Sequence, residues 1–146
     1  MTHHNIVETI PVRKLTPDAV LPTRSHPNDA GLDLYAVEDV ILPPGAGRTI
    51  KTGIAMALPT GFVGMIADRS SLAKKGIKIA GGIVDAGYRG EVMVVVWNIG
   101  GAEIRLQRGE RIAQMMIIPI ATPPVREVHV LDETSRGSSG FGSTGK

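Results

Sequence analysis

The sequence of 146 residues contains no cysteine. This absence excludes disulfides, thiol catalysis, zinc–thiolate sites and iron–sulfur clusters. Long apolar runs are also absent, so no transmembrane helix or signal peptide is expected. With 16 basic and 14 acidic residues, the formal net charge is only +2, too small to indicate a nucleic-acid-binding surface by itself. We therefore expect a cytoplasmic protein without membrane attachment or a stable nucleic-acid partner.

Aromatic residues make up only 3% of the chain, whereas apolar residues as a whole make up 42%. The core must therefore be aliphatic, and an aromatic residue outside an apolar segment requires an explanation. The 18 glycines and 10 prolines predict frequent turns and few long helices.

Short segments rich in Val and Ile alternate with turn clusters, which is typical of an all-β sandwich, barrel or jelly roll. A single short helix is expected at residues 70–75, with Ser70 as its N-cap and Gly76 ending it. We expect one β domain over residues 1–136 and a flexible Gly/Ser-rich tail over residues 137–146. The predicted strands cover residues 6–15, 32–36, 48–58, 62–67, 77–80, 91–98, 103–106, 111–119 and 125–131.

Residues 93–97 and 112–118 are apolar without alternation, so both faces of these strands should be covered. Either a well-buried sandwich interior or a subunit interface would provide that cover. The presence of two such strands in a small domain favours an oligomer.

The tail matches most of a P-loop, from Gly140 to Gly145-Lys146. It lacks the Ser or Thr after the lysine, the preceding strand and the following helix, so a P-loop NTPase is rejected. The glycines could still fold over a polyphosphate, with hydroxyls from Ser143 and Thr144 and the guanidinium of Arg136. A disordered linker end is the alternative, although an aromatic Phe141 in such a segment argues against it.

Two further segments have polar residues suited to a nucleotide. Arg69, Ser70 and Ser71 begin the short helix and could bind phosphate; a simple Ser cap with Arg69 paired to an acid is the alternative. Asp85 lies in a Gly-rich hairpin. It could act as a general base, and an Asx-turn residue is the alternative. Tyr88 in the same hairpin offers a ring for stacking, or packs within the turn.

Two acidic residues could hold a hydrated Mg²⁺: Asp29 and Asp33, the latter on the face opposite Leu34. A surface acidic strand is the alternative. Glu110 and Arg111 suggest a solvated ion pair, and Gln114 is an unusual polar residue within an apolar strand.

In their order along the chain, these segments resemble the five motifs of the trimeric, all-β dUTPase family. The resemblance covers nearly the whole chain from about residue 10. It implies a jelly-roll-like fold and a homotrimer whose active sites are shared between subunits. The matching segments are residues 29–34, 69–73, 84–91, 109–114 and 136–145.

The resemblance also implies a reaction: water attacks the α-phosphorus of dUTP, giving dUMP and pyrophosphate. This supplies dUMP for thymidylate synthesis and keeps uracil out of DNA. Asp85 matches the water-activating carboxylate, and Asp33 would reach Mg²⁺ through water. The residues implied to hold the α- and β-phosphates are Arg69, Ser70, Ser71 and Gln114, and those for the γ-phosphate are Arg136, Ser143 and Thr144.

Specificity for the deoxyuridine moiety is implied for the hairpin and the tail. The backbone of Ile83 and Val84 would pair with uracil, and Tyr88 would exclude a 2′-hydroxyl. Met93 would line the same pocket. Phe141 would stack over uracil when the tail closes, with Gly142 beside it.

The chain departs from the family pattern in the second motif, where Asp68 replaces a common proline and Ser71 a common glycine. A dCTP deaminase of the same fold is a rival interpretation, but the chain has no obvious counterpart of its catalytic glutamate. A catalytically silent nucleotide-binding trimer is another rival, and the intact Asp85 and complete tail argue against it.

Overall fold

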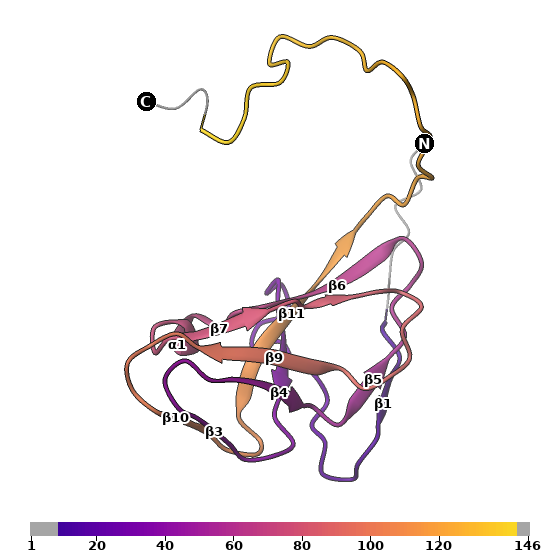
Figure 1. Ribbon diagram of the computed structural model, residues 1–146. Helices are drawn as coiled ribbons and strands as arrows, with labels where there is room; N and C mark the ends of the chain where they lie inside the picture. Colours follow the sequence, from indigo (N-terminus) through magenta and orange to yellow (C-terminus); the bar gives the residue numbers. More distant parts are fainter. Residues whose placement is uncertain (1–8, 143–146) are drawn as a thin grey trace.

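The β-rich expectation is confirmed by the computed structural model, which describes residues 9–142 (Figure 1). Short strands dominate, and one helix is present in the described part of the chain. No helix within residues 9–142 is long and apolar enough to cross a membrane. The elements are β1 (Val12–Lys14), β2 (Leu32–Tyr35), β3 (Val40–Leu42), β4 (Gly47–Lys51), β5 (Ile54–Met56), β6 (Phe62–Ala67), α1 (Ser70–Ala73), β7 (Ile77–Ala80), β8 (Ile83–Val84), β9 (Met93–Asn98), β10 (Ile104–Leu106) and β11 (Arg111–Pro119).

The strands form antiparallel sheets around an aliphatic core. A four-stranded sheet has the order β2-β11-β6-β8, a three-stranded sheet the order β4-β9-β7, and the pairs β1-β5 and β10-β3 complete the fold. Alternating side chains of these strands point inward, as expected for strands with one face on a core. Fully buried members of the core include Leu34, Leu42, Ile50, Val94, Val96, Ile112 and Met115.

The helix α1 lies where the sequence predicts it, but its start differs from the prediction. Arg69, not Ser70, is the N-cap, and it makes no side-chain cap hydrogen bond. Leu72 is the buried residue of this single turn. The helix ends at Ala73 with Lys74 as its C-cap, two residues before the predicted end at residue 75. Gly76 has a φ of +100°, a conformation that suits glycine, and lies in the turn that follows.

One long predicted strand, residues 48–58, is divided into β4 and β5. Thr52 and Gly53 form the break, and the φ of Gly53 is +69°. The Gly53 N–H donates to the carboxylate of Glu91 at 2.9 Å, and the Thr52 hydroxyl donates to the carbonyl of Val92. These contacts to the chain before β9 stabilise the bend.

The strand predicted at residues 125–131 is wrong. The chain after β11 is extended but unpaired there, and Val125 is 99% exposed. Pro123 and Pro124 lack the N–H groups that a strand ladder needs. Figure 1 shows this segment, in orange to yellow, leaving the sheets and arcing away from them.

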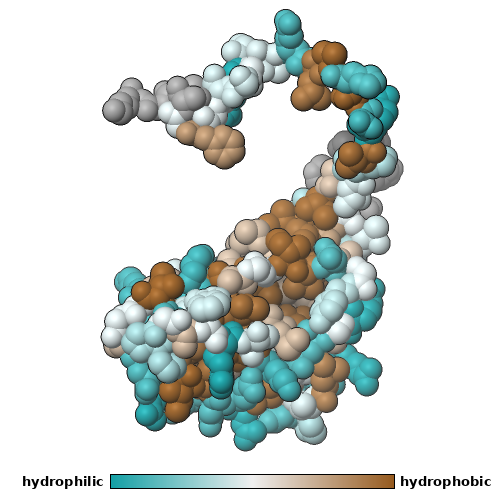
Figure 2. All heavy atoms as spheres, in the orientation of Figure 1, coloured by the Kyte–Doolittle hydropathy of each residue, from teal (hydrophilic) through white to brown (hydrophobic). Residues whose placement is uncertain are grey.

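Within the single chain, the apolar strands β9 and β11 are not covered on both faces. In β9, Val94 and Val96 are buried, whereas Met93 and Trp97 are exposed on the opposite face. Figure 2 shows apolar surface on the body near the point where the C-terminal segment departs. An apolar hollow of about 570 Å³, with Phe62 and Ile117 in its lining, is also open in the single chain.

Candidate functional site

A polar pocket lies between the loop before β2, the start of α1 and the middle of β11. Its volume is about 490 Å³. It brings together parts of three sequence segments that were singled out separately. The lining residues are Ser25, Asp29, Ala30, Gly31, Asp33, Arg69, Ser70, Ser71 and Gln114.

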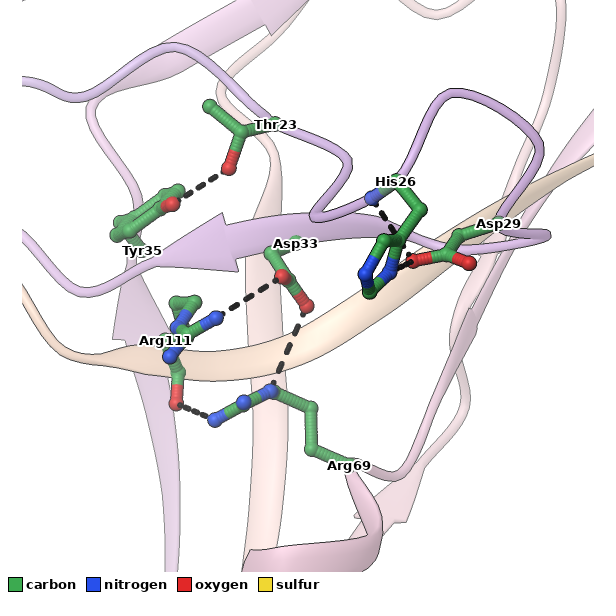
Figure 3. Close-up of polar contacts among 7 residues, drawn as sticks. All are labelled: Thr23, His26, Asp29, Asp33, Tyr35, Arg69 and Arg111. Carbon is green, nitrogen blue, oxygen red and sulfur yellow. Dashed lines mark hydrogen bonds and ion pairs between the residues drawn. The ribbon is translucent and has the colours of Figure 1, made fainter.

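Asp33 lies at the centre of the charged groups in this polar pocket (Figure 3). Its side chain is only 14% exposed, with Oδ1 at 3.4 Å from Arg69 Nε and Oδ2 at 3.6 Å from Arg111 Nη1. The expectation that Asp33 points away from Leu34 is confirmed, because Leu34 is in the core. The solvated pair expected for Arg111 with Glu110 is wrong, since antiparallel pairing of β11 with β2 brings Arg111 to Asp33.

Arg69 is held in place by two contacts. Besides the ion pair with Asp33, its Nη1 donates to the backbone carbonyl of Arg111 at 3.0 Å. Its side chain is 21% exposed, so the guanidinium is partly shielded from solvent yet still lines the pocket. Ser70 and Ser71 follow it at the exposed first turn of α1. This arrangement offers a guanidinium and hydroxyl donors to an anion.

Gln114 occupies the floor of the polar pocket in a fixed orientation. Its Nε2 donates to the carbonyl of Asp68 at 2.7 Å. A Cβ atom at Gly31 would lie 2.1 Å from Gln114 Oε1, so only glycine fits there. Nε2 carries a second hydrogen that this bond does not use. The unusual polar residue in β11 is thus explained by a contact with the loop that carries Arg69.

The two carboxylates considered for Mg²⁺ differ in their surroundings. Asp29 Oδ2 accepts the His26 N–H at 3.0 Å and lies 3.1 Å from His26 Nδ1 (Figure 3). Residues 9–142 contain no cluster of three or more His, Cys, Asp or Glu that could hold a metal ion. A donor set this small fits only a hydrated Mg²⁺ that takes most of its ligands from phosphates and water. Asp33 is the carboxylate that lines the polar pocket beside the phosphate-binding candidates.

A second pocket, the hairpin pocket, lies around β8 and the turn that follows it. Its volume is about 280 Å³. β8 is an edge strand with β6 on one side only, so its other edge presents backbone N–H and C=O groups. The lining residues are Thr49, Ile83, Val84, Asp85, Tyr88, Glu91, Val92, Met93 and Val95.

Asp85 begins the turn in this hairpin pocket. Its backbone carbonyl accepts the Tyr88 N–H at 3.1 Å, whereas its carboxylate makes no hydrogen bond or ion pair with any residue of 9–142. The Asx-turn alternative is therefore not what the structure shows. The Tyr88 hydroxyl donates to the Glu91 carbonyl at 2.8 Å, and the ring lies over Gly90. The tyrosine ring is thereby fixed in the pocket that Asp85 also lines.

The tail residues lie apart from both pockets in the single chain. Arg136 Nε donates to the Ser139 carbonyl at 2.9 Å, and Phe141 is fully exposed, at 115% relative accessibility. Gly142 is also exposed. Ser143 and Thr144 lie outside the described residues, so their expected contacts remain predictions.

The structure therefore brings the predicted site residues together in two groups, and no residue lines both pockets. Sequence reasoning missed the role of Arg111, which only the strand register brings to Asp33. It also missed Glu91, which lines the hairpin pocket and accepts the Gly53 N–H. Glu91 is the last residue of the segment 84–91, and its place in that segment could have indicated that it belongs to the site.

Comparisons with known proteins agree with these motifs. The family model for dUTPase matches residues 18–145. The chain is 50% identical over 140 residues to a deoxyuridine 5'-triphosphate nucleotidohydrolase of Nocardia farcinica, covering 93% of this chain and 85% of the relative. Among solved structures, the dUTPase of Staphylococcus bacteriophage 80alpha with dUpNHpp matches with a TM-score of 0.90 and 32% identity, covering 95% of this chain and 99% of that one. A mutant dUTPase from phage phi11 of S. aureus, described with a structural Mg(II) ion, matches with a TM-score of 0.79 and 30% identity, covering 84% of this chain and 97% of that one.

Proposed function

The chain belongs to the dUTPase family, and from this premise we propose which of its residues carry out the reaction. It is a hydrolase with the jelly-roll fold of that family and converts dUTP to dUMP and pyrophosphate. The observation that supports the residue assignment is the division of one chain into two complementary pockets. The polar pocket has cationic and hydroxyl groups for a triphosphate, and the hairpin pocket has apolar walls and a free carboxylate.

The complete active site forms in a homotrimer. The polar pocket of one subunit faces the hairpin pocket of a neighbour, and the tail of another subunit closes over both. This is supported by the absence of any shared lining residue and by the exposed apolar face of β9, which includes Met93 and Trp97. It is also supported by the C-terminal segment, which extends away from its own sheets (Figure 1).

The polar pocket holds the α- and β-phosphates. Arg69 donates from its guanidinium, Ser70 and Ser71 from their hydroxyls, and Gln114 from the hydrogen that its bond to Asp68 leaves unused. The Asp33 carboxylate keeps Arg69 and Arg111 aligned, so less ordering is needed when the phosphates bind.

The hairpin pocket binds deoxyuridine. Ile83 and Val84, on the open edge of β8, present backbone groups that pair with uracil. Cytosine is disfavoured because its amino group, a hydrogen-bond donor, would face a backbone N–H donor. Tyr88 lies beside the sugar and leaves no room for a 2′-hydroxyl, because its hydroxyl bond to Glu91 prevents the ring from moving aside. Met93 lines the same pocket.

Asp85 orients the water that attacks the α-phosphorus. Its carboxylate has no protein partner within residues 9–142, so its lone pairs can accept from a water molecule. The main contribution to the rate is positioning and stabilisation of charge on the phosphates, as is general for phosphoryl transfer. When bound, Mg²⁺ neutralises phosphate charge, and Asp33 would contact its hydration shell.

The tail, residues 137–146, and Arg136 immediately before it supply the remaining contacts. Arg136, with Ser143 and Thr144, binds the γ-phosphate, and Phe141 and Gly142 close over uracil. The full exposure of Phe141 supports this, because an unpacked aromatic ring gains most from a base to stack on. We place the enzyme in the cytoplasm, where it would supply dUMP for thymidylate synthesis and keep uracil out of DNA.

The test is a hydrolysis panel with dUTP, UTP, dCTP and dTTP in the presence of Mg²⁺, resolving monophosphate, pyrophosphate and ammonia. We expect dUMP and pyrophosphate from dUTP alone. Asp85→Asn should retain nucleotide binding and lose turnover, and ¹⁸O from labelled water should appear in dUMP. Ammonia from dCTP would instead identify a deaminase, and binding without turnover a silent nucleotide-binding protein. Label in pyrophosphate would refute attack at the α-phosphorus.

A further inference from the structure

Asp68 connects three parts of the fold immediately before the phosphate-binding residues. Its carboxylate Oδ1 accepts the Ile79 N–H at 2.7 Å, and its Oδ2 accepts from Lys78 Nζ at 2.9 Å. Its backbone carbonyl accepts from Gln114 Nε2 at 2.7 Å. Asp68 follows the last residue of β6, so it links that strand to β7 at the edge of the other main sheet and to β11.

The loop that carries Arg69, Ser70 and Ser71 has little stability of its own. The helix α1 is a single turn, and so short a helix does not persist without tertiary contacts. Its N-cap, Arg69, gives no side-chain cap hydrogen bond. On the upstream side, the contacts of Asp68 therefore determine where the loop begins.

The orientation of Gln114 depends on the same residue. A backbone carbonyl only accepts hydrogen bonds, so the amide nitrogen, not the oxygen, must face Asp68. The oxygen then lies against Gly31, and the second amide hydrogen remains for a phosphate oxygen. If the Asp68 backbone shifted, both this amide and the Arg69 loop would move.

We propose that Asp68 is a positioning residue for the polar pocket, holding the Arg69–Ser71 loop and the Gln114 amide in the arrangement that receives the triphosphate. The inference rests on the proposed function. Proline at this position would restrain the backbone through its ring. Here the hydrogen bonds and the ion pair of Asp68 restrain the backbone, so substitutions can remove these contacts one at a time.

The test compares Asp68→Ala and Asp68→Asn in the full chain, with Asp18→Ala as matched control. Asp18 is likewise an aspartate in an ion pair, with Arg108 at 2.7 Å, but it lines neither pocket. Affinity for dUpNHpp is measured by calorimetry and affinity for deoxyuridine by NMR titration. For Asp68→Ala we expect about tenfold weaker dUpNHpp binding, the size of one lost hydrogen bond to phosphate, with unchanged deoxyuridine binding.

Asp68→Asn should fall between wild type and Asp68→Ala, because its amide oxygen can still accept the Ile79 N–H. Lys78→Met should match Asp68→Asn, and this pair carries the test if Asp68→Ala does not fold. Unchanged dUpNHpp affinity in all variants, or equal weakening of both ligands, would overturn the positioning role. If the wild type cleaves no dUTP but the binding pattern holds, the proposed reaction fails and the positioning role stands.

Discussion

Replacing Gly31 with alanine tests the packing of the polar pocket directly. The added Cβ would lie 2.1 Å from Gln114 Oε1 and 2.9 Å from Gln114 Cβ, so the amide oxygen cannot stay in place. Rotating Gln114 away breaks its 2.7 Å hydrogen bond to Asp68, and keeping it requires β2 and β11 to separate. Breaking the hydrogen bond lowers the free energy of unfolding by about 1 kcal/mol. Separating the strands lowers it by about 1–3 kcal/mol.

If Gln114 rotates away, the effect on activity should exceed the effect on stability. A hydrogen bond to a charged group contributes about 1.5–3 kcal/mol, so loss of the Gln114 contact should lower kcat/KM for dUTP by about 10- to 100-fold. Steady-state pyrophosphate release gives kcat/KM, and thermal unfolding at fixed protein concentration gives the stability change. Gly101→Ala is the matched control, because a Cβ there would meet nothing within 4 Å.

A double-mutant cycle with Gln114→Ala identifies the clash as the cause. In the Gln114→Ala background the 2.1 Å clash with the amide oxygen is removed and only the 2.9 Å contact with the Cβ of residue 114 remains. Gly31→Ala should therefore cost less stability than in the wild type, and little further activity. Wild-type kcat/KM for Gly31→Ala, or the same stability loss in both backgrounds, would refute the reasoning.

Three other perturbations have defined outcomes. Tyr88→Ala should raise activity on UTP relative to dUTP, because the fixed ring no longer excludes a 2′-hydroxyl; an unchanged dUTP/UTP ratio would contradict the steric role. Deleting residues 137–146 should remove most activity while gel filtration still shows a trimer, and loss of the trimer would make the tail structural. Partial burial acts to raise the pKa of Asp68, but the Ile79 N–H and the Lys78 ammonium outweigh it and hold that pKa below its usual value. Wild type should therefore be more stable than Asp68→Asn near pH 6. This stability difference should disappear as the pH falls below about 4 and passes through the lowered pKa of Asp68, where the carboxylate is protonated. A stability difference that stays constant down to pH 2 would exclude the ionised carboxylate as the cause.

The local features of this protein could be read from its residues. Val- and Ile-rich segments with frequent Gly and Pro turns predicted the all-β class, since strand periodicity and turn chemistry are local properties. The alternation of Leu32, Asp33 and Leu34 predicted that Asp33 leaves the core, and the structure confirms it. The order of the five motifs identified the family.

The errors arose where backbone pairing decides the outcome. Residues 125–131 have the composition of a strand but no partner strand in the single chain, and two prolines precede them. Ser70 has the chemistry of an N-cap, yet the N-cap of the helix is Arg69, one residue earlier. Arg69 directly follows Asp68, whose carboxylate accepts the Ile79 N–H. Composition cannot specify such partners, because they are distant in sequence.

The sequence by itself determined the fold class and the family, and it predicted the segments that we propose to bind phosphate and uracil, because each depends on local residue patterns. Only the tertiary structure decided that Asp33 aligns Arg69 with Arg111, that Gln114 lies over Gly31, and that the site residues form two separate pockets. The physical reason is register: antiparallel pairing of β11 with β2 and β6 sets which side chains meet across strands, and a shift of one residue would turn each to the other face.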